Sequence, residues 1–127
     1  MKPRDIEQGP WEDALTEARE AMIATVRSAK GMIAYGDLTS KITALRMAPD
    51  SHALRELLGD VSRAENTAGR GMLSVVVVHK DGPNRGRPGN GFFTLAQELG
   101  HDTHDREKFW ISEFEKVRKF WKDEAAN

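Results

Sequence analysis

The length, composition and charge of this 127-residue chain limit both its fold and its chemistry. Domains usually have about 100 to 200 residues, so we expect one compact domain over residues 10–124, preceded by a flexible N-terminus over residues 1–9. The chain contains no cysteine, which excludes disulfides, Cys-ligated metals and a thiol nucleophile. With 19 Lys and Arg against 20 Asp and Glu, the formal net charge is −1. Any affinity for a nucleic acid must therefore come from a local patch.

No segment has the pattern of a signal peptide or a membrane span. The first eight residues are mostly charged or polar and contain no apolar run. Apolar runs such as Val75 to Val78 are far shorter than the roughly 20 residues that a spanning helix needs. We therefore expect a cytoplasmic protein that does not contact a membrane.

Apolar residues recur three or four positions apart in four segments, which predicts four helices. The first covers residues 10–30 and ends at Gly31, and the second covers residues 35–45 and is stopped by Pro49. The other two run from the caps Asp50 and Ser51 to the break at Gly69 to Gly71, and over residues 103–122.

A strand and a basic loop are expected between the third and the terminal helix. Met72 to Lys80 contains four consecutive valines bounded by glycines, the pattern of a buried strand. Asp81 to Gly91 is rich in Gly, Pro and Asn, which predicts a loop with a basic tip. Phe92 to Leu99 is expected to form a short second strand that runs into a helical turn and stops at Gly100. This order predicts an α+β, mostly helical fold: a winged helix-turn-helix with flanking N- and C-terminal helices.

The span from Tyr35 to Gly100 resembles the DNA-binding half of the alkylguanine-DNA alkyltransferases and alkyltransferase-like proteins. The resemblance is carried by the sequence Tyr-Gly-Asp-Leu at 35–38, by Gly59 and by the valine-rich segment 75–80. It implies a winged-helix architecture. The family's strand has a Pro-Cys-His-Arg motif, whereas here a valine precedes His79-Lys80, so alkyl transfer is excluded. Arg55 lies four residues before Gly59, where the family's arginine wedge lies three before its glycine, which puts base flipping in doubt.

The chain also resembles an uncharacterised bacterial family with four short motifs. They stand here as Tyr35 to Leu38, Leu58 to Ser62, Gly69 to Val78 and Pro88 to Phe93. The last two read Gly-Arg-Gly-Met-Leu-Ser followed by valines, and Pro-Gly-Asn-Gly-Phe-Phe. This resemblance supports the fold expectation and leaves the function open.

Basic and amide side chains in the third helix and the loop are candidate DNA ligands. Cations there would bind phosphates, and the asparagines would reach base edges or sugars. The candidates are Arg55, Arg63, Arg70, Lys80, Asn84, Arg85, Arg87 and Asn90. Glu56, Asp60, Glu65 and Asp81 are interspersed among them, so the alternative is an ordinary solvated surface. We favour a small non-enzymatic DNA-binding module with a regulatory or accessory role; the alternative is a protein-binding adaptor on the same scaffold.

Histidines and tryptophans offer two further interpretations. His101 and His104, close to two aspartates, form a secondary candidate for a metal site, but no third ligand accompanies them, and a helix cap explains the segment equally. We expect no metal, no cofactor and no catalytic residues. Trp110 and Trp121 belong either to the core or to a surface that contacts a partner or a second copy.

Overall fold

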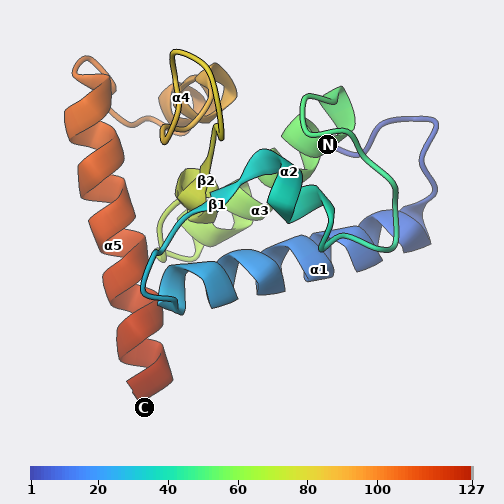
Figure 1. Cartoon of the computed structure of the whole chain (residues 1–127), viewed down its shortest axis with the longest axis horizontal. Coiled ribbons are helices and arrows are strands. Elements are labelled where there is room, and N and C mark those ends of the chain that lie inside the picture. The colour runs from blue at the N-terminus through green and yellow to red at the C-terminus, as the bar shows by residue number, and fades with distance from the viewer. Residues whose placement is uncertain (127) are drawn as a thin grey trace.

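The computed structural model describes residues 1–126 of the chain, and the side chains of residues 1–124. The fold is α+β and mostly helical, as the sequence predicts. In chain order, the elements are α1 (Gln8–Arg27), β1 (Ile33–Ala34), α2 (Tyr35–Thr39), α3 (His52–Thr67), the 3-10 helix η1 (Leu73–Val76), β2 (Val77–Val78), α4 (Asn90–Glu98) and α5 (Arg106–Ala126). Figure 1 shows α1 along one side of the domain and α4 on the opposite side, while α5 crosses the C-terminal end of α1.

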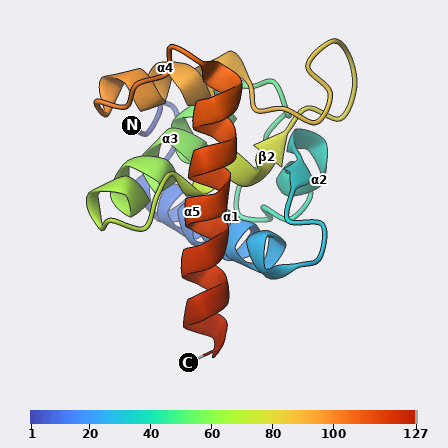
Figure 2. The same cartoon turned by 90° about the vertical axis from the view of Figure 1, so that its left-hand side faces the viewer.

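Two long outer helices, α1 and α5, enclose much of the core. On α1, the apolar residues at helical spacing are buried at Trp11, Ala18, Met22 and Val26, whereas Leu15 is half-buried. On α5, Val117 and Trp121 are buried, and this helix packs against α1 and η1. Figure 2 shows α5 crossing in front of α1, with its N-terminal end beside α4. No helix within residues 1–126 is both long enough and apolar enough to cross a membrane.

The second helix is shorter than predicted, because α2 ends at Thr39 instead of continuing to residue 45. The hydroxyls of Thr39 and Ser40 donate to backbone carbonyls one turn back, which competes with continuation of the helix. The following loop is held by the Glu17 carboxylate of α1, which accepts hydrogen bonds from the backbone amides of Thr43 and Ala44. Tertiary contacts thus override the helical periodicity of this segment.

The third helix begins as predicted: the Ser51 hydroxyl caps α3 by accepting a hydrogen bond from the Leu54 amide, at 3.2 Å. The valine-rich segment that follows was expected to be a strand over residues 72–80, but only Val77–Val78 is one. It pairs in parallel with β1, which has only two residues. The preceding residues form η1, where side chains satisfy the backbone: the amide of Met72 donates to Glu113 and that of Ser74 to the Ser62 hydroxyl. Burial is as predicted, since residues 71–78 are all buried.

The segment after the basic loop is a helix, so the expectation of a second strand over Phe92 to Leu99 is wrong. Phe92, Phe93, Leu95 and Ala96 are buried and Thr94 between them is exposed, the pattern of one helix face rather than the alternation of a half-buried strand. The β2–α4 loop (residues 79–89) is closed by hydrogen bonds from the Gly86 amide to the His79 carbonyl and from the His79 amide to the Arg87 carbonyl. Within residues 1–126 the sheet consists of β1 and β2.

Candidate functional site

The main candidate site is a cleft of about 770 Å3 between α3, α4 and the β2–α4 loop. This volume is in the range of pockets that hold small ligands. Four of the residues predicted to bind DNA line it: Arg55 and Arg63 from α3, Asn84 from the loop, and Asn90 at the start of α4. The fold therefore brings together residues up to 35 positions apart on one concave surface.

Tyr35, His79 and Gly89 form one wall of the cleft. The Gly89 amide donates a hydrogen bond of 3.0 Å to the Tyr35 hydroxyl. The Tyr35 and His79 rings lie 5.1 Å apart, centroid to centroid. A Cβ atom at position 89 would lie 3.2 Å from both the Tyr35 hydroxyl and His79 Nε2. Glycine therefore permits the close approach of these three groups.

Burial raises the pKa of Tyr35 above its usual value, although the Gly89 amide acts in the opposite direction. The hydroxyl is therefore protonated at neutral pH. Since its oxygen already accepts the Gly89 N–H, its own hydrogen is left to donate.

A second hydroxyl, that of Ser74, lines the cleft from η1 and is 6% exposed. Ser62 donates to the Ser74 hydroxyl oxygen at 2.6 Å and accepts the Ser74 backbone amide at 3.0 Å. Around the two hydroxyls, the wall is apolar and is formed by Leu58, Phe92 and Leu95.

The charged residues of the cleft differ in their pairing. Arg55 donates to the Asp50 backbone carbonyl, and within the described residues its guanidinium has no carboxylate at ion-pair distance. Arg63 lies 3.3 Å from an Asp60 oxygen and 3.6 Å from a Glu98 oxygen. His52 similarly faces Glu56 at 3.7 Å. Arg55 is thus the unpaired arginine at the mouth of the cleft.

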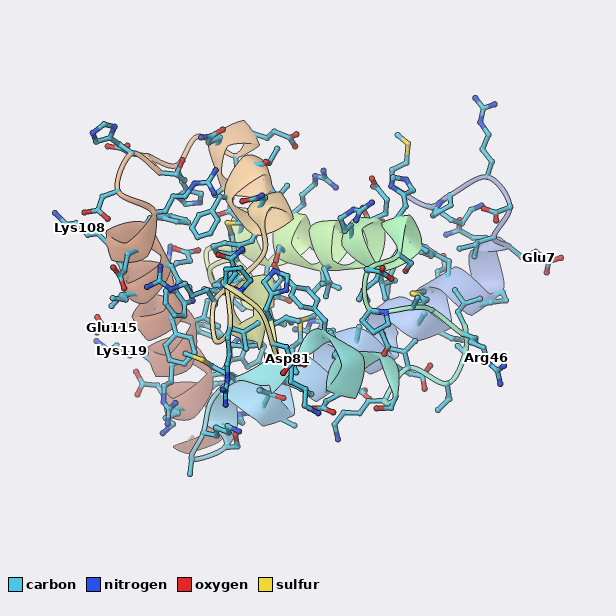
Figure 3. All side chains as sticks on the ribbon, turned by 45° about the horizontal axis from the view of Figure 1, so that its top comes forward. Glu7, Arg46, Asp81, Lys108, Glu115 and Lys119 are labelled. Carbon is cyan, nitrogen blue, oxygen red and sulfur yellow. The ribbon has the colours of Figure 1, made fainter. Side chains whose placement is uncertain are left out.

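The β2–α4 loop carries the other predicted cations beside the cleft. Lys80 and Arg85 are exposed, and over residues 1–126 neither forms an ion pair with a carboxylate. Arg87 lies 3.4 Å from Glu107 of α5, but both side chains are more than half exposed, so this pair is weak. The loop extends away from the helices, and Figure 3 marks Asp81 on it.

Arg70 is the one predicted DNA ligand that lies neither on the cleft nor on the β2–α4 loop. It binds the carboxylate of Glu65, which is 2% exposed and also accepts from Arg19 at 2.7 Å. Burial alone would raise the pKa of Glu65, but the hydrogen bonds and charges of Arg70 and Arg19 outweigh it and hold the pKa below its usual value. The role supported for Arg70 is therefore structural.

The two histidines considered for metal binding lie in different surroundings. His101 Nε2 lies 2.8 Å from the Asn66 amide oxygen, and its ring packs on Phe109, whereas His104 is exposed. Among the described residues, no three His, Asp or Glu side chains are grouped closely enough to hold an ion. The Asp102 and Asp105 carboxylates accept backbone amides at the start of α5, as a helix cap does.

Trp121 belongs to the core, and Trp110 packs against the core while partly exposed. Trp121 is 7% exposed and lies between the guanidinium groups of Arg19 and Arg27, each about 5.5 Å from its ring. Trp110 is half-buried, and its indole nitrogen is fully covered.

Sequence reasoning did not identify three residues of the cleft: Tyr35, Ser74 and Gly89. A signal existed for Ser74, because it is the one polar residue in the apolar run from Met72 to Val78. The His79 ring makes an aromatic contact with Tyr35 and, among the described residues, no side-chain hydrogen bond.

Comparison of the chain with protein-family models, with curated proteins and with solved structures gave no match.

Proposed function

We propose that the protein is a small, non-enzymatic winged-helix module that binds double-stranded DNA in a regulatory or accessory role. In this proposal α2 and α3 are the helix-turn-helix pair, joined by the long connection over residues 40–51, and the β2–α4 loop is the wing. The observation that carries the proposal is the grouping of unpaired cations: Arg55 on α3 lies on the cleft, and Lys80 and Arg85 lie on the loop beside it.

Phosphate binding would supply most of the affinity. Arg55, Lys80 and Arg85 can each neutralise one phosphate without first leaving a carboxylate. Arg87 would exchange Glu107 for phosphate, at small cost because the pair is exposed. Asn84 and Asn90 would contact sugars or base edges; the Asn90 amide oxygen is already taken by Arg106, so its NH2 group is the free donor. So few phosphate contacts predict weak, nonspecific affinity, with a Kd of about 1 to 100 μM.

The test is fluorescence anisotropy with a labelled random-sequence duplex at several salt concentrations between about 50 and 200 mM. Replacing both Arg85 and Arg87 with Ala should weaken binding to all sequences about equally and make the salt slope shallower by about two. Arg46→Ala is the matched control, because Arg46 is also an exposed loop arginine, and Figure 3 shows it far from Asp81 of the wing loop.

If the duplex does not bind at low salt, or if both variants behave like the unchanged protein, the wing does not contact DNA. The protein-binding adaptor would then be the better hypothesis, favoured by the net charge of −1. Its surface would be sought on the outer face of α5, where Figure 3 shows Lys108, Glu115 and Lys119 pointing away from the domain.

A further inference from the structure

We propose that the cleft between α3, α4 and the β2–α4 loop binds a small aromatic anion, an aromatic ring that carries a carboxylate or a phosphate. This inference goes beyond the proposed function and does not depend on DNA binding. It rests on the size of the cleft, on its hydrogen-bond donors and on the position of one unpaired arginine.

The inner part of the cleft offers donors to a ligand that presents oxygen acceptors. The Tyr35 hydroxyl has its oxygen engaged by the Gly89 amide, which leaves its hydrogen free. The Ser74 hydroxyl, hydrogen-bonded to Ser62, adds a second polar group to the cleft. The His79 ring lies beside Tyr35 and can donate or accept, depending on its tautomer. A buried donor without an acceptor is unfavourable, so a group with two or more oxygens would be stabilised here.

The walls suit a ring. Leu58, Phe92 and Leu95 contribute apolar side chains, each at most 7% exposed, and Tyr35 and His79 contribute aromatic surface. A cleft of about 770 Å3 accommodates a ligand of one or two rings with room for solvent.

Charge favours an anion at one point of the rim. The acidic residues of the cleft are Asp50, Glu56 and Glu98. Glu56 lies 3.0 Å from the N-terminal ammonium of Met1 and Glu98 lies 3.6 Å from Arg63, whereas Asp50 forms no ion pair within the described residues. Arg55 has its positive charge uncompensated by a carboxylate within the described residues, and it lies across from Gly91, whose Cβ position is 3.9 Å from Arg55 Cδ. A guanidinium in this position would bind a carboxylate or a phosphate with two parallel hydrogen bonds.

The experiment titrates benzoate, phenyl phosphate, benzyl alcohol and inorganic phosphate into the 15N-labelled full chain and follows the backbone amide signals by NMR. We expect saturable binding of benzoate, phenyl phosphate or both, with the largest shifts at His79, Gly89 and Asn90. Benzoate alone would identify a carboxylate ligand, and phenyl phosphate alone a phosphate ester. Inorganic phosphate and benzyl alcohol, which lack either the ring or the charge, should bind more weakly by about tenfold or more.

Two pairs of variants test the assignment. Arg55→Ala should weaken binding of the aromatic anion by about tenfold or more, whereas Arg46→Ala should leave this affinity unchanged. Gly89→Ala places a methyl group between the Tyr35 hydroxyl and His79 and should also weaken binding, whereas Gly9→Ala, on open surface, should not. The proposal is overturned if no aromatic anion binds up to about 10 mM, if benzyl alcohol binds as tightly as benzoate, or if Arg55→Ala has no effect. Since no DNA is present, these outcomes are independent of the wing test.

Discussion

The hydroxyl of Tyr35 accepts a hydrogen bond from the backbone amide of Gly89, 54 residues further along the chain, at 3.0 Å. This contact ties the start of α2 to the residue that precedes α4. It closes one side of the cleft and fixes the end of the β2–α4 loop. One side-chain oxygen thus connects the proposed helix-turn-helix segment to the proposed wing.

Replacing Tyr35 with Phe should lower the free energy of unfolding by about 1 kcal/mol, because the Gly89 amide loses its partner while the ring still packs. Amide hydrogen exchange at Gly89 should become faster, whereas exchange in α1 should increase only as much as the overall loss of stability requires. Urea unfolding and NMR-detected exchange measure both effects. Unchanged exchange at Gly89 would show that the hydrogen bond does not hold the loop.

Glu65→Gln should destabilise the protein by about 2 kcal/mol at pH 7, because it removes a charge that is hydrogen-bonded to both Arg19 and Arg70. The pKa of Glu65 is lowered in the folded state, so its contribution is present above its usual pKa of 4.5 and is lost as the pH falls through the lower, folded-state pKa. The stability difference between the unchanged protein and the variant should therefore narrow below about pH 4.5.

Urea unfolding at a series of pH values checks this prediction, and Glu115→Gln, an exposed change on α5, is the control. A difference that stays constant between neutral and acidic pH would mean that shape, rather than charge, accounts for the effect.

Gly71→Ala should cost about 3 kcal/mol, and Gly69→Ala about 1 kcal/mol. Both glycines have a positive φ, +92° and +79°, so both substitutions strain the backbone. At Gly71, however, the new Cβ would also lie 2.8 Å from a methyl carbon of Val117, whereas at Gly69 no atom lies within 4 Å. Thermal or urea unfolding of the two variants separates steric contact with α5 from backbone strain. Equal losses would contradict the close packing of α5 on this turn.

Removing divalent ions with a chelator should leave the melting temperature unchanged. His101 binds Asn66 and His104 is exposed, so no ion is required to hold the segment before α5. A structural site would couple metal binding to folding, and a clear decrease of the melting temperature with chelator would therefore show that an ion is bound. Adding back Zn²⁺ or Mg²⁺ separately would then identify it.

Local periodicity in the sequence predicts where most helices lie and which residues they bury. The spacing of Trp11, Ala18, Met22 and Val26 marks the buried face of α1, because 3.6-residue periodicity is a local property of the chain. The cap at Ser51 is equally local, since its partner is three residues away.

Whether the short apolar segments form strands or helices depends on their tertiary contacts. Residues 72–78 are buried as predicted, but burial of a short apolar run does not distinguish a strand from a short helix. The outcome depends on residues that are distant in the chain. Because β1 has two residues, only two of the valines pair with it. The backbone amides of Met72 and Ser74 donate instead to Glu113 and to the Ser62 hydroxyl.

The cleft was beyond sequence reasoning for the same physical reason. Tyr35, Ser74 and Gly89 meet there because α2, η1 and α4 pack together, and nothing in the local sequence of any of them encodes that distance. The charges behaved likewise: Arg70 and Arg85 look alike in the sequence, yet the fold pairs Arg70 with buried Glu65 and leaves Arg85 exposed. Local periodicity encodes burial, whereas the partner of each polar group is set by the packing of elements that are far apart in the chain.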